Sequence, residues 1–285
     1  MILLGVLGMS IEDATAAFAE MCVTLFPNEG YDPESRSAKL EEVSKELLSK
    51  RGLSYVTRLR GETKLATQCK VCVLLTKWFN NFISFTSSSV CYMSAINLGP
   101  CLMLRNYASR HAAYNPTIVE AIRIAWATPG IFSSVHIGPT FMKEEFVSAV
   151  NGTNNPTFEA IKEVNEVFGG QSRISCLLSL GAGKLINLSA NAENMLEQTA
   201  QDTEGTAREL QMCLEKLGVY FRFSVDRGLE SHHSQLGLVV SHTSVYLNDS
   251  AVSQKLEECV DALKYLNGVA LEQLCMYTFS SLQCL

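Results

Sequence analysis

The sequence lacks several features that mark common classes of protein. It has no run of Lys or Arg, and 23 basic against 29 acidic residues give a net charge of −6, which argues against a protein that grips nucleic-acid backbones. It has no stretch of eighteen apolar residues, so no membrane-spanning helix is predicted. The apolar start, Met1 to Met9, carries no basic residues, and it therefore does not have the form of a secretion signal. A reducing, cytoplasmic location is predicted.

The composition is that of a globular protein. The chain has 285 residues, of which 47% are hydrophobic and 18% are charged, with only 7 Pro, and this is well above the apolar content of disordered chains. The length allows one large α/β domain or two small ones, and the absence of linkers favours one. The 10 cysteines are scattered, mostly in apolar runs, where a free thiol packs as a small hydrophobe.

Apolar spacing and turn residues divide the chain into helices and strands in alternation. Helices are predicted from Ser10 to Pro27, 37–50, 117–128, 155–168, 191–217 and 250–267, and strands over 69–75, 101–104, 146–150, 174–180 and 220–225. The segment Lys77–Tyr92 fits neither pattern. Alternating strands and helices predict a layered α/β sheet.

Several segments, taken in order, resemble the patatin-like phospholipases, especially their fungal branch. They are the run from Tyr114 to Phe132, the segments around Phe146 and Asn154-Asn155-Pro156, the strand Ile174–Gly183, and Val219–Phe223. The resemblance covers about residues 1–270 and implies a partial patatin-like domain there, followed by a C-terminal tail over 271–285. It implies a three-layer α/β/α fold with a mostly parallel central sheet that lacks its first strands. A protein partner that covers the exposed sheet is therefore a further expectation.

The family hydrolyses lipid or phospholipid acyl esters with a serine in a Gly-x-Ser-x-Gly turn and an aspartate base. This sequence contains no Gly-x-Ser-x-Gly, and Met1–Ser10 resembles the segment that follows the serine. The aspartate position falls on Ser148, followed by Ala149 and Val150 in place of glycines. A hydroxyl cannot accept a proton as a carboxylate does. The resemblance therefore implies no catalytic residue, no cofactor and no metal ligand in this chain.

Other motifs have structural interpretations that are favoured over functional ones. Ser148 lacks the surroundings of a nucleophile, and Cys69 and Cys72 point to opposite faces of the predicted strand. His232, His233 and His242 have no other ligands at metal-binding spacing. The run Gly181–Lys184 lacks the first glycine of a phosphate loop. Three glycosylation acceptor patterns begin at Asn151, Asn187 and Asn248 and are expected to stay unmodified without secretion.

Three functions remain open. The first is a patatin-like lipid acyl hydrolase domain that has lost its catalytic residues. The second is a longer natural chain that is active as a phospholipase or lysophospholipase, which Ser148 argues against. The third is a non-enzymatic remnant of the same fold that binds a protein partner.

Overall fold

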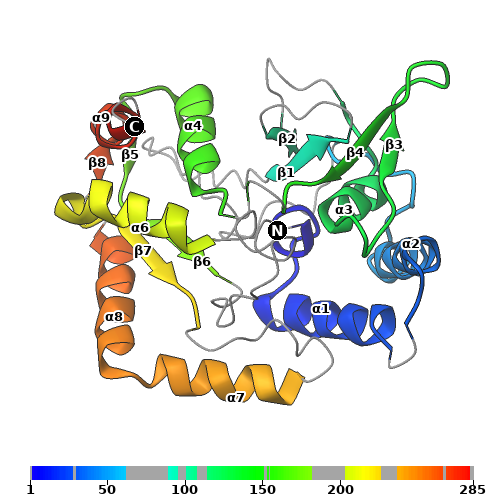
Figure 1. The fold of residues 1–285 in the computed structure, drawn as a ribbon, viewed down its shortest axis with the longest axis horizontal. Coiled ribbons are helices and arrows are strands. Elements are labelled where there is room, and N and C mark those ends of the chain that lie inside the picture. The colour runs from blue at the N-terminus through cyan, green and yellow to red at the C-terminus, as the bar shows by residue number, and fades with distance from the viewer. Residues whose placement is uncertain are drawn as a thin grey trace, which may run out of the picture. The chain divides into compact units, whose positions relative to one another are not determined.

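The computed structural model describes residues 2–27, 30–61, 89–95, 101–107, 114–150, 153, 155–181, 203–225, 236–265 and 268–282. These residues belong to two units, 1–153 and 154–285, which are described separately (Figure 1). The predicted division into a domain over 1–270 and a tail over 271–285 stays a prediction. The predicted strand at 69–75 lies outside the described residues.

The first unit combines helices with an antiparallel sheet. Its elements are η1 (Ile2–Val6), α1 (Ile11–Leu25), α2 (Pro33–Lys50), β1 (Ser89–Ser94), β2 (Leu102–Arg105), α3 (Ile118–Trp126), β3 (Val135–Ile137) and β4 (Glu144–Ser148).

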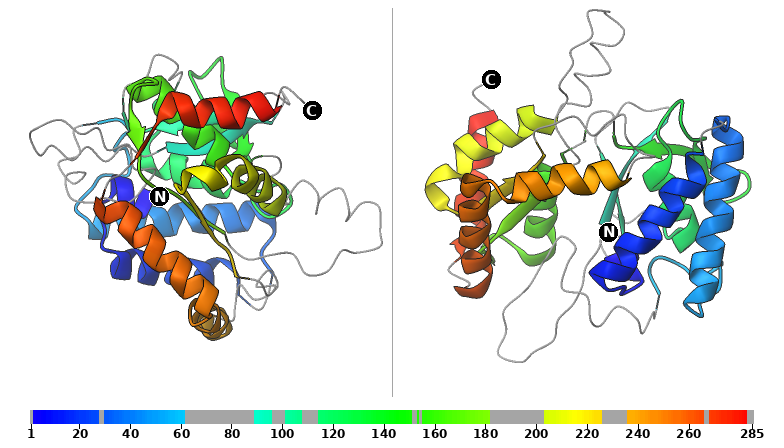
Figure 2. Two further views of the ribbon diagram at one scale, coloured as in Figure 1. Left: turned by 90° about the vertical axis from the view of Figure 1, so that its left-hand side faces the viewer. Right: turned by 90° about the horizontal axis from the view of Figure 1, so that it is seen from below.

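Capping side chains set where the first helices begin. The Asp13 amide donates to Ser10 Oγ at 3.0 Å, which confirms the predicted start of α1. Helix α2 begins earlier than predicted because Asp32 Oδ1 accepts from the amides of Glu34 and Ser35, with Pro33 in the first turn. The two helices lie side by side (Figure 2).

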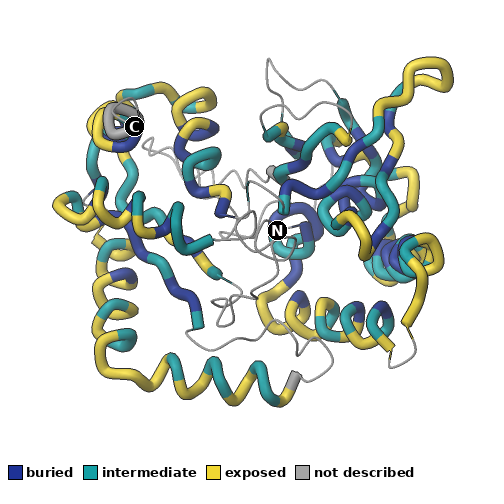
Figure 3. Tube along the Cα trace, in the orientation of Figure 1, coloured by how far each residue is buried: buried dark blue, intermediate teal, exposed yellow. Residues whose placement is uncertain are grey.

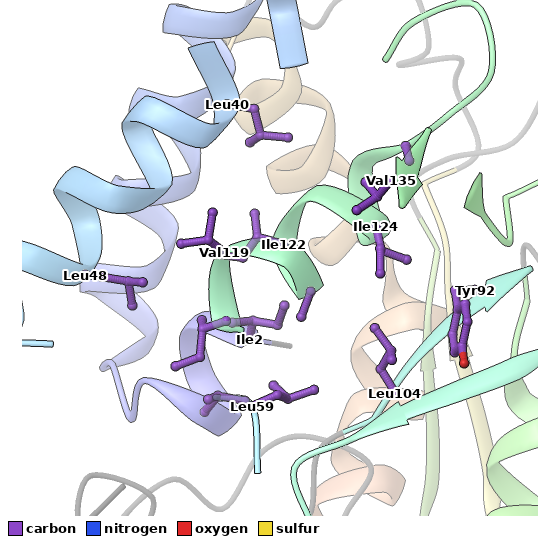
Figure 4. Close-up of a cluster of buried hydrophobic side chains, with 14 of the residues drawn as sticks. Ile2, Leu40, Leu48, Leu59, Tyr92, Leu104, Val119, Ile122, Ile124 and Val135 are labelled. Atoms are coloured by element: carbon purple, nitrogen blue, oxygen red, sulfur yellow. The ribbon is translucent and has the colours of Figure 1, made fainter. Parts of the chain in front are cut away.

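Helix α3 occupies the middle of the first unit's core. It begins with a capping box in which Thr117 and Glu120 each bond the other's backbone amide. On one side of α3, Val119 and Ile122 lie toward Leu48 of α2, and on the other Ile124 lies toward Leu104 of β2 (Figure 4). The polar side chains of the helix, Glu120 and Arg123, lie on its remaining, partly exposed side.

The sheet of the first unit has the order β2-β1-β4-β3, and every pair in it is antiparallel. The predicted fold class, a three-layer α/β/α domain with a mostly parallel central sheet, is therefore wrong. The reason lies in the connections: residues 95–101 join β1 to β2 and residues 138–143 join β3 to β4. Such links suit hairpins, whereas parallel neighbours need a crossover of about a dozen residues or more.

The β3–β4 hairpin ends in an exposed apolar tip. Phe141 is 97% exposed and Met142 is 72% exposed, and the burial colours show the tip as exposed (Figure 3). Gly138 has φ 131°, and a Cβ there would lie 2.5 Å from the Met142 carbonyl oxygen. Only glycine fits this turn.

The second unit is mainly helical. Its elements are α4 (Thr157–Phe168), β5 (Arg173–Ile174), β6 (Leu177–Leu180), α6 (Thr203–Leu214), η3 (Glu215–Leu217), β7 (Tyr220–Phe223), α7 (Leu236–Leu247), α8 (Ser250–Tyr265), β8 (Val269–Ala270) and α9 (Leu271–Leu282). Strands β5 and β8 pair antiparallel, and β6 and β7 pair parallel.

The β6–β7 pair has one apolar and one polar face. Phe221 and Phe223 pack with Cys259 of α8 on the apolar face. Leu178 and Leu180, their partners in register on β6, are 45% and 71% exposed. The sequence predicts a fully buried strand here, and that prediction is wrong for β6 within the described part of the chain.

Candidate functional site

Ser148, at the predicted aspartate position, is buried at the end of β4 opposite Tyr92 of β1. Its amide donates to the Ala127 carbonyl at 3.0 Å, and its Oγ accepts from the Val150 amide at 3.2 Å. In the described residues, no Asp or Glu side chain hydrogen-bonds to it. The hydroxyl therefore closes a local turn, and nothing in its described surroundings activates it as a nucleophile.

A different serine contacts a carboxylate, and no motif in the sequence indicates this contact. Ser134 Oγ, just before β3, donates to Glu145 of β4. Glu145 stands opposite His136 in the β3–β4 register. Ser134 and His136 are two positions apart along the extended chain, so their side chains point to the same face. The side chains of Ser134, His136 and Glu145 therefore share one face of the hairpin. His136 is exposed there, and this open setting suits a cross-strand contact better than a catalytic site, which excludes water.

The polar face of the β6–β7 pair carries a hydrogen-bond network that joins four elements. Arg222 of β7 donates through Nη1 to Ser179 Oγ and through Nη2 to Glu204 Oε1 of α6, both at 3.0 Å. Thr157 Oγ1, at the start of α4, donates to Asn155 Oδ1 at 2.6 Å and lies 3.2 Å from Ser179 Oγ. The Arg222 side chain is only 9% exposed, so its charge depends on this pairing.

Tyr220 borders the same network. Burial raises the pKa of its phenol, and its buried hydroxyl has no hydrogen-bond partner among the described residues. The neighbouring Asn155 amide nitrogen also donates to the Thr203 carbonyl at 3.2 Å. The network thus fixes the start of α4 and of α6 against the strands.

Gly181 follows β6 directly and lies against this network. A Cβ on it would be 2.6 Å from Ser224 Oγ and 2.7 Å from Arg222 Nη2. Its amide donates to the Phe223 carbonyl at 2.8 Å. The Gly181 amide is therefore already used in the β6–β7 pairing. The rest of the run Gly181–Lys184 lies outside the described residues.

A groove of about 610 Å³ lies where α6, η3, β7 and α8 meet. Its lining combines apolar, amide and charged side chains: Leu214, Phe221, Gln211, Gln254, Lys255 and Glu258 contribute to it. The Lys255 ammonium lies 5.8 Å from the centre of the Phe223 ring, so the cation is held at this wall of the groove.

The remaining predicted positions divide into described and undescribed ones. His242 is half-buried on α7, and Asn248 precedes Asp249, whose Oδ1 accepts from the amides of Ala251 and Val252 at the start of α8. Other candidates fall outside the described residues, namely Cys69, Cys72, Asn151, Asn187, His232, His233 and most of Lys77–Tyr92.

Two kinds of feature are absent from the described ranges. No group of three or more His, Cys, Asp or Glu side chains there is placed to hold a metal ion. No helix there is long and apolar enough to cross a membrane.

Comparison with known proteins adds no family. No protein-family model matches the chain, and no curated protein sequence matches it significantly. The patatin-like resemblance therefore stays a prediction that rests on the sequence segments.

Proposed function

We propose that this chain is a catalytically inactive relative of the patatin-like lipid acyl hydrolases. The proposal depends on the surroundings of Ser148. Its hydroxyl accepts a hydrogen bond from the Val150 amide in the turn after β4. The sequence segments between Tyr114 and Phe223, which resemble those of the family and follow one another in the same order, support the relationship. The antiparallel sheet of the first unit does not support it, so the proposal depends on the sequence segments and on Ser148.

Ester hydrolysis tests this proposal directly. We expect the purified chain to hydrolyse a short-chain nitrophenyl ester and phospholipid vesicles no faster than a heat-inactivated sample. Ser148→Ala should leave this background unchanged, because Ser148 has no described base.

Ser134→Ala is the matched comparison, because Ser134 is the strand-associated serine that bonds a carboxylate. Turnover above the heat-inactivated control that disappears in either serine variant would overturn the proposal. Turnover that persists in both variants would overturn it as well, since the protein would then be an enzyme with another nucleophile.

A specific observation favours partner binding as the role of the inactive protein. Leu178 and Leu180 project from β6 with large exposed fractions, beside the buried Phe221 and Phe223. Among the described residues β6 pairs only with β7, so its other edge can accept an extended segment of a protein partner. This partner would cover the exposed part of the sheet. We also propose a reducing, cytoplasmic compartment for the chain, where the described cysteines are thiols unless an oxidant reaches them.

Charged substitutions on β6 test the partner. We expect tagged wild-type protein to recover one partner in stoichiometric amount, and we expect Leu178→Lys with Leu180→Lys to lose it. Met212→Lys is the matched control, because Met212 is 81% exposed on α6. Recovery that is equal for wild type and the β6 variant, or loss in the Met212 variant alone, would contradict binding at β6.

A further inference from the structure

Two cysteines far apart in the sequence meet in the second unit. Cys176 lies between β5 and β6, and Cys259 lies on α8, 83 positions later. Their Sγ atoms are 3.7 Å apart. Both thiols belong to the cluster around Phe221 and Phe223 on the apolar face of the β6–β7 pair.

The two sulfurs are in van der Waals contact. A disulfide has an S–S distance of about 2.05 Å, so side-chain rotations and a shift of α8 are needed to join the two sulfurs. Cys259 is 3% exposed, whereas Cys176 is partly exposed. An external reagent therefore reaches Cys176 first, and Cys259 is in position to react second.

We propose that Cys176 and Cys259 form a dithiol redox site that a small-molecule disulfide, such as oxidised glutathione, converts to an intramolecular disulfide. The Cys176 thiolate attacks one sulfur of the oxidant, which forms a mixed disulfide and releases one small thiolate. Cys259 then loses its proton and attacks the Cys176 sulfur, which releases the second small thiolate. The protein loses two electrons, the oxidant gains them, and the two cysteine protons end on the two released thiols.

The surroundings of Cys176 and Cys259 determine how fast the two thiols are oxidised. Burial raises the pKa of the Cys176 thiol to about 12, and Cys259 contributes to this rise. Burial also raises the pKa of Cys259, against the opposing effects of Cys176 and the Lys255 ammonium on α8. Tyr246 of α7 packs on the same cluster. Since the thiolate is the attacking species, the reaction is slow at neutral pH and should accelerate about tenfold per pH unit in the alkaline direction.

The cross-link would act on the groove described above. Glu258 precedes Cys259, Lys255 lies one turn earlier on α8, and both line the groove. Oxidation would tie this wall of the groove to the segment that leads into β6. The redox state of the pair would therefore control how far α8 can move away from β7.

The test uses the full chain, with excess oxidised glutathione as the oxidant. Trypsin releases peptides 174–184 and 256–264, each with one of the two cysteines. We expect the mass of the intact chain to fall by two hydrogens and a linked pair of these peptides to appear. The rate of linkage should rise about tenfold from neutral pH to one unit above it. Cys176→Ser and Cys259→Ser should each abolish the linked pair, while Cys213→Ser should retain it, because Cys213 lies outside the cluster on α6.

Three results would overturn the proposal. In the first, glutathione remains bound to Cys176 of the wild type. In the second, Cys176 or Cys259 forms a disulfide with another cysteine of the chain. In the third, the folded wild type does not react with excess oxidised glutathione. Cys176→Ala and Cys259→Ala provide folded substitutes if a buried serine destabilises the unit, and circular dichroism checks each variant. The wild-type peptide map decides the question even if no variant folds.

Discussion

Gly181→Ala should destabilise the second unit through a steric conflict with the polar network. The added Cβ would lie 2.6 Å from Ser224 Oγ, 2.9 Å from Ser224 Cβ and 2.7 Å from Arg222 Nη2. Ser224 Cβ is fixed by the backbone, and the Arg222 guanidinium is held by Ser179 and Glu204. Neither group can withdraw without losing contacts, so we expect a cost of about 1–3 kcal/mol in the free energy of unfolding, as for overpacked sites.

Gly237→Ala is the matched control, because a Cβ on this helical glycine meets nothing within 4 Å. It should be neutral or stabilising by up to about 1 kcal/mol, since alanine is the better helix former. Urea unfolding followed by far-ultraviolet circular dichroism measures both variants. Tryptophan fluorescence serves as an internal reference, because both tryptophans precede residue 154. If Gly181→Ala is as stable as wild type within about 0.5 kcal/mol, the inferred steric conflict is refuted.

Two further substitutions test the packing of each unit. Phe146→Ala should cost about 3–5 kcal/mol in urea unfolding, because Phe146 is fully buried and meets the Tyr92 ring edge-on. The control is Phe141→Ala, at a side chain that is 97% exposed, and it should change the free energy of unfolding by less than about 0.5 kcal/mol. Equal effects of the two substitutions would contradict the assignment of Phe146 to the core. Arg222→Met should cost about 2 kcal/mol, below the value for a fully buried pair because Glu204 is 25% exposed and regains water. A double-mutant cycle with Glu204→Gln should give a coupling energy above about 0.5 kcal/mol, and strict additivity would show that the ion pair contributes nothing.

Local signals in the sequence predicted the boundaries of some helices well. Ser10 caps α1 as predicted, and the Asn155-Pro156 and Gly169-Gly170 pairs bracket α4 as predicted. These signals succeed because a cap or a stop depends on residues within one turn of each other. Helix α7 was missed because its sequence has no charged residues and no one-sided apolar stripe, which are the cues that reveal a surface helix.

Strand pairing was not accessible in the same way. The alternation of strands and helices suggested crossovers, but β1 pairs with both β2 and β4 in antiparallel register. The sequence of a strand does not by itself determine which strand lies beside it in the sheet, because pairing depends on contacts between residues distant in sequence. The apolar run in β6 likewise indicated burial that the fold does not provide for Leu178 and Leu180.

The candidate sites follow the same division. That residue 148 is a serine and not a carboxylate is a matter of residue identity, which the sequence contains. The Ser134–Glu145 bond and the Cys176–Cys259 contact depend on a hairpin register and on packing across 83 positions. No spacing rule for cysteine or serine motifs covers such separations.

The β3–β4 hairpin has a practical consequence for work at high concentration. Phe141 and Met142 lie on a turn whose backbone conformation requires Gly138. Two molecules can associate through these exposed apolar side chains, and Met142 is also open to oxidation. Replacing this pair with serine or lysine leaves every core contact in place. Preparations for crystallisation or spectroscopy should then stay monodisperse for longer and lose one exposed methionine that peroxide can oxidise.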